Sequence, residues 1–389
     1  MNTLRGSNLL VWSIIIVLLV AVGGYFIRGY VSGNSQGAAA AQESVVRIGF
    51  IGPMTGPFAT WGESIQYGAE LAAEDTRHRI EIDYQDDACQ APQAVNAAQK
   101  FFNVDDIHIV IGPGCDDSLK AIMPLAKEHD ALVLSTGLLG DDVFAANPTN
   151  VINLSTQVST EAAFLAAYLR ARGITSVGII HGDNSLGQEF GKRLPERLAS
   201  FGIKTTIDEN TSLSATDLRT TAVKIKYSEP DAVFVHQGEE QVGLFAKQFR
   251  QLNGTAPLYG MYGTESQNVI TAGGAAVEGM RYTYPVNSAD ESAQKETFEK
   301  RYIAKFNVPP TATSFFVYDG IMLIDKALDV CSATDGACVE KFLKQYGPYE
   351  GLSGKMEIQA DGKNVRPFGI KEIKNGEFVW ITKTITMGE

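Results

Sequence analysis

The sequence predicts an α/β protein made of two lobes, each a doubly wound parallel sheet with helices on both faces. Short apolar runs rich in β-branched residues alternate with helical stretches from Val45 onward, with few interruptions. These runs are continuous rather than alternating, which is typical of parallel strands buried on both faces. The alternation passes through two rounds of similar size, and this indicates two lobes.

The first round occupies residues 45 to about 150. Its predicted strands are 45–53, 79–87, 107–113 and 131–136. Its predicted helices are 61–75, 92–103 and 118–130. Each strand is bounded by glycine, proline or short polar residues, which end strands and open turns. The segment NVINLSTQ, residues 150–157, interrupts the alternation and separates the two rounds.

The second round repeats the pattern. Its predicted strands are 176–183, 203–210, 231–238 and 256–263. Its predicted helices are 160–173, 186–202, 217–230 and 240–254, with Gly173, Gly202 and Gly254 marking helix ends. Ligands of open parallel sheets bind at the carboxyl ends of strands. We therefore expect the glycine-rich and polar loops after these strands to line a cleft.

The N-terminal segment 1–28 predicts a membrane anchor or a signal segment. Leu9–Ile27 is a run without a charge that would span roughly 30 Å as a helix, enough for a bilayer core. A cleaved signal has a shorter apolar stretch with its small-residue site close behind, whereas Ala39 and Ala41 lie well past the run. We favour an uncleaved anchor, followed by a flexible linker at 29–44, and an exported remainder; a cleaved signal is the alternative.

Composition and motifs exclude several function classes. The chain has 33 Lys+Arg against 45 Asp+Glu, a formal net charge of -12, which argues against nucleic acid or an anionic membrane surface as a partner. The motifs of dinucleotide-binding, phosphate-binding, zinc-peptidase and serine-hydrolase sites are absent. Adjacent acidic residues at strand-to-helix turns more often favour a helix N-terminus than form an acid/base pair. We expect a binding protein without cofactor or metal, not an enzyme.

The four cysteines predict disulfides, because an exported chain meets an oxidising compartment. Three pairings are possible. Cys331 and Cys338 bracket the short loop SATDGA and are the natural local pair, which leaves Cys89 with Cys115. The latter bond would stabilise the fold by about 3.5 kcal/mol. A catalytic or metal-binding Cys115 is disfavoured, because the sequence has no CxxC and its five histidines are scattered.

Seven stretches carry a resemblance to a known family. They are RIGFIGPMTGPFATWGESIQYGAELA, YQDDACQAPQAV, IVIGPGC, VGIIHGDNSLGQEFGKRL, DAVFVHQGEEQVGLFAKQFRQLN, AAVEGMRYTYPV and SFFVYDGIMLIDKAL. They resemble type I periplasmic substrate-binding proteins, in particular the leucine/isoleucine/valine-binding branch that serves ABC importers. The resemblance runs from Val45 to the C-terminus, and its most specific elements are GPMTG followed by WG and DDAC with a later cysteine.

This resemblance implies two α/β lobes joined by three crossovers, which close around a small ligand. The crossovers would fall near 154–157, 284–287 and 351–356. Lobe one would comprise 45–155 and 286–351, and lobe two would comprise 156–285 and 352–389. The family pairs the cysteines that correspond to Cys89 and Cys115.

The family's function would make the chain an extracytoplasmic protein that captures a small polar ligand, an amino acid, amide or amine, for an ABC permease. The alternative is a ligand-sensing domain that signals through a partner membrane protein.

The resemblance also implies ligand-binding positions. They are Trp61, Asp116, Gly137, Leu139, Leu186, Glu239, Tyr262 and Tyr318. Trp61 and Tyr318 match the family pattern. The others include departures, because Asp116 stands for the serine that holds a ligand carboxylate, Leu139 for a threonine, Leu186 for a tyrosine and Tyr262 for a glutamate.

An acidic and aromatic pocket follows if Asp116 and Glu239 face the cleft, and such a pocket favours a cationic or neutral polar ligand. The competing interpretation makes Asp116 and Glu239 favourable charges at helix starts and Tyr262 and Tyr318 core tyrosines. His181 and His236, lone residues at strand ends, are interpreted as structural.

Overall fold

The computed structural model describes residues 45–145, 148–286 and 292–385. Chain contacts separate Met1–Val45 from a compact unit, Val46–Glu389, and the unit is described below. The predicted anchor at 1–28 and the linker at 29–44 lie outside the described residues. Within the described ranges, no helix is long and apolar enough to cross a membrane.

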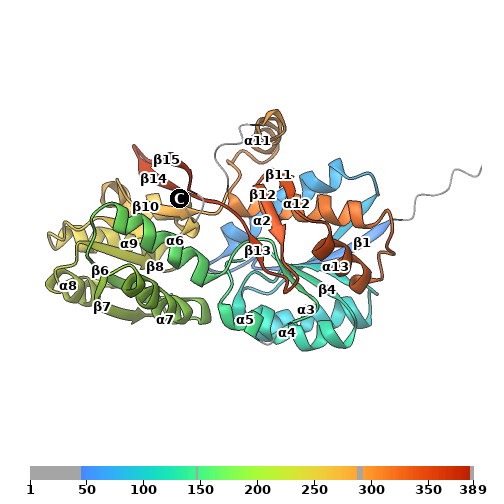
Figure 1. Ribbon diagram of the computed structural model, residues 1–389, viewed down its shortest axis with the longest axis horizontal. Helices are drawn as coiled ribbons and strands as arrows, with labels where there is room; N and C mark the ends of the chain where they lie inside the picture. The colour runs from blue at the N-terminus through green and yellow to red at the C-terminus, as the bar shows by residue number, and fades with distance from the viewer. Residues whose placement is uncertain (1–44, 146–147, 287–291, 386–389) are drawn as a thin grey trace, which may run out of the picture. The chain divides into compact units, whose positions relative to one another are not determined.

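The first sheet has five parallel strands in the order β2-β1-β3-β4-β5. Two of them, β1 and β4, are labelled in Figure 1. The strands are β1 (Val46–Gly52), β2 (Ile80–Asp86), β3 (Ile109–Ile111), β4 (Leu132–Ser135) and β5 (Val151–Asn153). The segment that interrupts the sequence pattern therefore contributes the last strand, β5. Successive residues of β3 enter different hydrophobic clusters, since Ile109 and Ile111 pack in one and Val110 in the other. Both faces of this sheet are therefore buried, as the continuous apolar runs predict.

Helices on the two faces supply these clusters. The helices near this sheet are α2 (Ala59–Asp75), α3 (Ala91–Asn103), α4 (Asp116–Glu128), α5 (Asp141–Ala145), α11 (Ala293–Phe306), α12 (Ala312–Ala327) and α13 (Gly336–Gln345). α2 packs against α12, and α3 packs against α4. Ser64 and Ser314 join the first pair through a buried hydroxyl contact of 2.9 Å.

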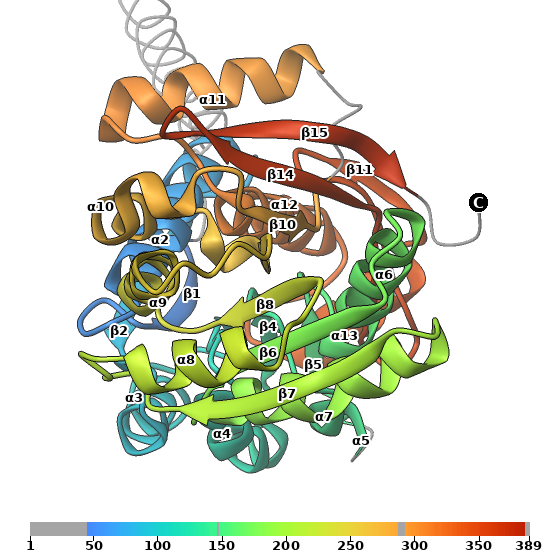
Figure 2. The same cartoon turned by 90° about the vertical axis from the view of Figure 1, so that its left-hand side faces the viewer.

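The second sheet has seven strands in the order β15-β14-β10-β9-β8-β6-β7. They are β6 (Ser176–Gly182), β7 (Lys204–Thr211), β8 (Ala232–His236), β9 (Leu258–Gly260), β10 (Arg281–Tyr284), β14 (Phe368–Lys374) and β15 (Glu377–Ile385). The first five are parallel, and β14 and β15 form the long antiparallel pair in Figure 2. The predicted doubly wound sheets are confirmed, with this antiparallel edge as an addition.

Of the helices of the second sheet, α6 (Val158–Ala171) precedes β6, and the others come after strands of this sheet. The others are α7 (Ser185–Ser200), α8 (Arg219–Tyr227), α9 (Glu239–Gln251), α10 (Gln267–Gly273) and the 3-10 turns η1 (Tyr262–Thr264) and η2 (Gly274–Val277). Asn184 begins α7 as a side-chain cap that accepts a hydrogen bond from the Gly187 amide at 3.0 Å. α9 starts directly after β8, so its first turn lies at the carboxyl edge of the sheet.

A third, small sheet is formed by β11 (Tyr349–Gly351), β12 (Gly354–Ile358) and β13 (Asn364–Val365). It lies against the first sheet, because the Asn153 amide donates to the Gly362 carbonyl at 2.9 Å. The chain then enters β14 of the second sheet. The lobe boundaries stay a prediction, and these contacts lead us to propose that the third crossover lies near Arg366 rather than at 351–356.

Arg366 connects the three passages between the sheets. Its guanidinium donates to the Leu154 carbonyl at 2.6 Å and to the Pro285 carbonyl at 3.0 Å, and it lies over the Phe316 ring at 4.2 Å. Burial lowers the pKa of Arg366 to about 10, so the side chain stays charged at neutral pH. One buried cation thus holds the backbones of all three connecting segments together.

Candidate functional site

A cavity of about 460 Å³ lies between the two sheets. Its walls come from α2 and the starts of α3, α4 and α12 on the first lobe, and from the loops after β6, β7, β8 and β9 on the second. These loops follow the carboxyl ends of parallel strands, where the sequence predicts the cleft. Direct contacts join the lobes near it, including Lys120 Nζ to Ser185 Oγ at 3.1 Å and Asn268 Nδ2 to Thr60 Oγ1 at 3.3 Å.

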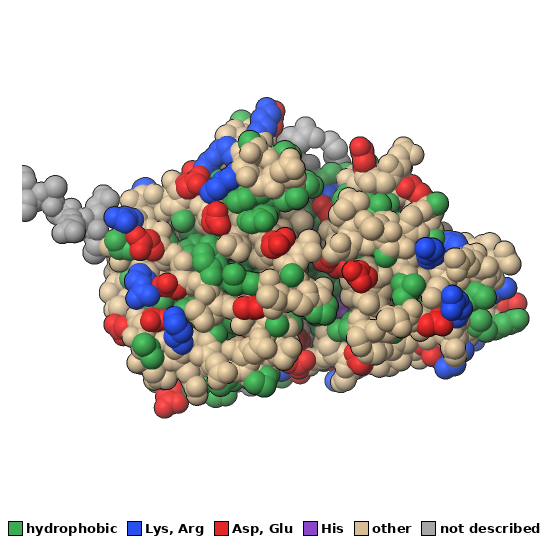
Figure 3. Space-filling model, turned by 180° about the vertical axis from the view of Figure 1, so that it is seen from behind, with side chains coloured by type: hydrophobic (Ala, Val, Ile, Leu, Met, Phe, Trp, Pro, Cys, Tyr) green, Lys and Arg blue, Asp and Glu red, His purple; other side chains and the backbone are tan. Residues whose placement is uncertain are grey.

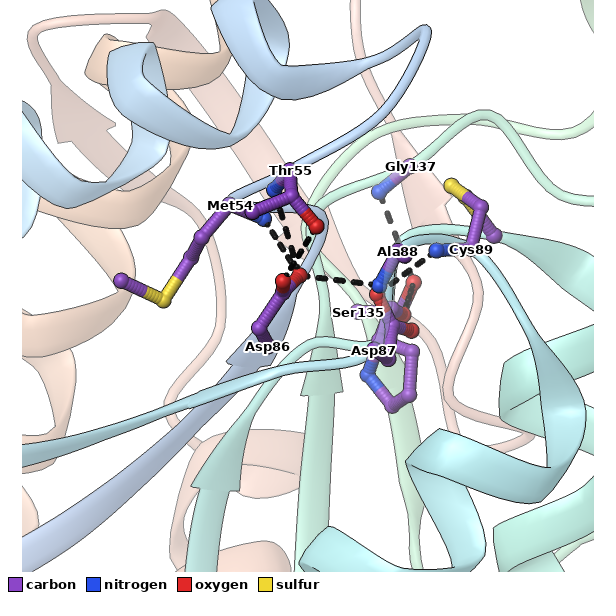
Figure 4. The surroundings of a disulfide bond; sticks show 10 residues. Met54, Thr55, Asp86, Asp87, Ala88, Cys89, Ser135 and Gly137 are labelled. Atoms are coloured by element: carbon purple, nitrogen blue, oxygen red, sulfur yellow. Dashed lines mark hydrogen bonds between the residues drawn. A yellow bond between two sulfur atoms is a disulfide. The ribbon is translucent and has the colours of Figure 1, made fainter.

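The Cys89–Cys115 disulfide links the loops after β2 and β3 at the cavity wall, and Cys331–Cys338 links the end of α12 to α13. Both predicted disulfides are confirmed. Figure 4 shows how the first loop is held, with the Asp86 carboxylate accepting from the Met54 and Ala88 amides at 2.8 and 2.9 Å. The Cys89 amide donates to Asp87 at 3.0 Å.

Asp116 is the first residue of α4 and follows the disulfide directly. Its side chain lines the cavity and is 2% exposed. Oδ2 accepts from the Gly140 amide at 2.9 Å, whereas Oδ1 is buried without a hydrogen-bond partner. Lys120 Nζ is 3.8 Å from Oδ2 but only 2.7 Å from Asp142. Burial, only partly offset by the Gly140 amide and Lys120, raises the pKa of Asp116 to about 7.

Glu239 begins α9 on the opposite lobe and also lines the cavity. Its Oε2 accepts from Ser266 Oγ at 2.6 Å and from Asn268 Nδ2 at 2.9 Å. Burial raises the pKa of this carboxyl, and no Lys or Arg of the described chain forms an ion pair with it. The side chain is therefore more than a favourable charge at a helix start, because it is half-buried and faces the cavity wall.

His236 and Gln237 end β8 and begin the loop to α9. His236 is buried, and its Nδ1 has no hydrogen-bond partner. Burial lowers the pKa of His236 to about 3, so the ring is neutral. Gln237 Nε2 donates to Thr211 Oγ1 at 2.8 Å, and its buried Oε1 has no partner. The interpretation of His236 as structural is incomplete, because it lines the cavity.

Trp61, Tyr262 and Leu186 supply aromatic and apolar walls. Trp61 on α2 lies against Gly114, where any side chain would collide with the indole ring. Tyr262 is buried, and its hydroxyl lies 3.2 Å from Ser155 Oγ in the first passage between the sheets. Burial raises the pKa of Tyr262, so its hydroxyl is neutral at physiological pH.

Three of the predicted ligand-binding residues are not among the described residues that line the cavity. Leu139 packs inside the cluster between the first sheet, α3 and α4. Gly137 is buried with its Cα against the backbone of Gly114. The Tyr318 hydroxyl donates to Asp75 at 2.8 Å, and its ring packs edge-on against Phe298. The side chains of Leu139 and Tyr318 pack in the core, and Gly137 has none, so the ligand-binding role of these three positions stays a prediction.

The cavity is acidic. Five carboxylate residues line it, namely Asp116, Asp117, Asp183, Glu239 and Glu265, and no Lys or Arg is among its described lining residues. Glu265 is neutralised by Lys371 at 2.5 Å. The outer face in Figure 3 differs, because Lys and Arg are interspersed there with Asp and Glu. The cavity therefore offers acceptors and negative charge to a ligand.

Comparisons with known proteins agree with this architecture. A family model described as periplasmic binding protein matches residues 45–377. A Leu/Ile/Val-binding protein homolog from Brucella melitensis is 23% identical over 353 residues, which cover 88% of this chain and 95% of that protein.

Two solved structures are similar to this chain. A leucine binding protein from Thermotoga maritima has a TM-score of 0.81 and 20% identity, covering 87% of this chain and 98% of that one. An ABC transporter solute binding protein from R. palustris in complex with benzoate has a TM-score of 0.78 and 19% identity, covering 88% and 98%.

Proposed function

The chain belongs to the periplasmic binding protein family, and on that premise we propose that it captures a small polar ligand, an amino acid, amide or amine, for an ABC permease. Proteins of this family act outside the cytoplasm as substrate-binding components of transport rather than as enzymes. The predicted family is confirmed. The ligand, the permease and a tether through Leu9–Ile27 belong to the proposal.

The observation that carries the proposal is the cavity shared by two lobes. A ligand that contacts both walls favours the closed arrangement over any arrangement in which one wall is withdrawn. The contact between Tyr262 and Ser155 at 3.2 Å ties the second lobe's wall to the first passage between the sheets. Closure around a ligand is therefore coupled to the connecting segments. The closed, ligand-bound protein differs in shape from the empty protein, and a permease can distinguish the two.

The lining favours an amine or an amide over a carboxylate ligand. Leucine, for which the Thermotoga maritima protein is named, and benzoate, bound in the R. palustris protein, both carry a carboxylate. In this chain Asp116 occupies the start of α4, and no Lys or Arg is among the described lining residues. A carboxylate placed there would lie beside the Asp116 carboxyl, and Lys120, 3.8 Å from Asp116, is already paired with Asp142 at 2.7 Å.

Binding is tested with the full chain in mild detergent, because Leu9–Ile27 is apolar. Thermal unfolding is followed with aliphatic amino acids, amides, amines and aromatic acids, each added in large excess. A ligand at 100 times its Kd adds about 2.7 kcal/mol of stability, a shift of several degrees. We expect a shift with at least one amine or amide.

Tryptophan fluorescence provides the matched control. Trp61 lines the cavity, whereas Trp380 on β15 packs against Tyr284. Trp61→Phe should abolish the ligand-dependent change in emission, and Trp380→Phe should keep it. The absence of any thermal shift across all four ligand classes would contradict the proposed function.

A further inference from the structure

We infer that the ligand is a cation with N–H donors at both ends, held by Asp116 on the first lobe and by His236 and Gln237 on the second. This inference rests on the proposed function and deepens it by naming the chemical class of the ligand. It starts from three polar atoms in the cavity wall that lack a protein partner: Asp116 Oδ1, His236 Nδ1 and Gln237 Oε1.

Unpartnered polar atoms of this kind are rare in folded proteins, and leaving them buried is unfavourable. All three can accept a hydrogen bond, and none is directed to a donor of the described chain. Asp116 and His236 are 4% and 8% exposed, so bulk water does not satisfy them as it satisfies a surface group. Asp116 Oδ1 and Gln237 Oε1 are acceptor atoms, and His236 Nδ1 accepts when Nε2 carries the proton, so a ligand with N–H donors can supply the missing partners.

The first pole is the Asp116 carboxylate. Its Oδ2 accepts from the Gly140 amide at 2.9 Å, whereas Oδ1 is buried without a partner in a residue that lines the cavity. The nearest cation, Lys120, is held by Asp142 at 2.7 Å and by Ser185 at 3.1 Å. Asp116 can thus accept a charge-assisted hydrogen bond from an ammonium or guanidinium group.

The second pole lies across the cavity at the end of β8. Gln237 uses its amide nitrogen on Thr211, so its remaining free group is the carbonyl oxygen. His236 presents Nδ1 of a neutral ring, which accepts a hydrogen bond when Nε2 carries the proton. Glu239, two residues further along, adds a half-buried carboxylate to the same wall. A second N–H group fits this pole, whereas a carboxylate end does not.

The walls between the poles favour a positive charge. Asp117, Asp183 and Glu239 line the cavity, and none of them forms an ion pair with a Lys or Arg of the described residues. Trp61 presents an indole ring in the same wall, and such a ring attracts a cation over its face. A linear diamine combines charge, donors at two ends and an apolar middle for Leu186 and Leu138.

The test measures binding of three probes of similar length to the full chain by titration calorimetry. The probes are 1,4-diaminobutane, butylamine and 4-aminobutyrate. We expect 1,4-diaminobutane to bind at least tenfold tighter than butylamine, because it occupies both poles. 4-Aminobutyrate should bind most weakly, because its carboxylate meets the acceptors at the second pole.

Two variants separate the poles. Asp116→Asn keeps the shape of the side chain and should weaken 1,4-diaminobutane at least tenfold. Gln237→Met removes one acceptor of the second pole and should weaken 1,4-diaminobutane while leaving butylamine unchanged. Glu240→Gln, an equal loss of charge at an exposed neighbour that does not line the cavity, should change neither affinity.

Two results would overturn the inference. Equal affinity for butylamine and 1,4-diaminobutane would show that His236 and Gln237 do not bind a second N–H group. Unchanged binding in Asp116→Asn would show that Asp116 does not bind the first. Tight binding of leucine without binding of amines would reject the inference and leave the proposed function standing. Absence of binding by the three probes and by leucine, titrated beside them, would contradict both.

Discussion

Asp116 at the cavity and Asp319 on α12 are buried to nearly the same extent, but their partners differ. Asp319 is fully enclosed, and both of its oxygens are used. Oδ1 accepts from the Leu352 amide at 2.8 Å, and Oδ2 accepts from the Ser353 amide and hydroxyl at 2.8 and 2.5 Å. Asp116 has one backbone donor, from Gly140, and one oxygen without a partner.

The pKa directions reflect this difference. Burial raises the pKa of Asp319 to about 6, against the lowering effect of the Ser353 and Leu352 hydrogen bonds. Burial raises the pKa of Asp116 further, to about 7, because fewer donors oppose it. Burial alone thus does not distinguish these two carboxyls. They differ in hydrogen bonding, because both oxygens of Asp319 have donors whereas Asp116 Oδ1 has none.

The largest expected effect comes from removing Asp319. Asp319→Ala leaves the Leu352 and Ser353 amides buried without an acceptor, and we expect a loss of about 4 kcal/mol in the free energy of unfolding. Urea denaturation measures it. Asp361→Ala, which removes an acid from the partly exposed pair with Lys363, is the control and should cost much less. Equal losses in the two variants would show that the Asp319 contacts are not structural.

The two disulfides sharpen the comparison, because Cys115 directly precedes Asp116. Cys89–Cys115 closes a separation of 26 residues and Cys331–Cys338 one of 7. From the loop-closure entropy we expect the corresponding double Cys→Ser variants to lose about 3.5 and about 2.4 kcal/mol in the free energy of unfolding, measured by urea denaturation. Only the loss of the first should also weaken ligand binding. A binding defect in Cys331→Ser/Cys338→Ser would contradict a local role for Cys115 in positioning Asp116.

Asp116→Asn is expected to change the free energy of unfolding in the opposite direction, by stabilising the fold. The folded state holds the Asp116 proton more tightly than the unfolded chain does, where the pKa is about 3.9. Stability therefore falls as the pH rises from about 4 to about 7, and the full penalty is present above that. The difference between these pKa values limits the penalty to about 4 kcal/mol, and Asn removes it, so we expect a gain of about 2 to 4 kcal/mol at pH 8 and none at pH 4. Urea denaturation at both pH values checks this, and destabilisation at pH 8 would place Asp116 with Asp319 as a structural group.

The strands and helices could be predicted from the sequence, because each depends on the pattern of residue types within a short stretch of chain. β3 and β4 are fully buried runs that alternate between two clusters, and such runs read as parallel strands without further information. Cys331 and Cys338, seven residues apart, can meet through one short loop. The family resemblance implies ligand positions for Trp61, Asp116, Leu186, Glu239 and Tyr262, and all five line the cavity.

The sequence by itself determined the alternation of elements, the two sheets and the acidic character of the loops at their carboxyl edges, because these depend on residue types and short-range periodicity. Only the tertiary structure decided which side chains reach the cavity. The Tyr318 hydroxyl donates to Asp75, 243 positions away in the chain, and Leu139 packs in the core. His236 reaches the cavity although its sequence context marks it as structural. These side-chain positions depend on contacts between residues far apart in the chain. Such contacts form only when the lobes pack, because residues then compete for donors, acceptors and space.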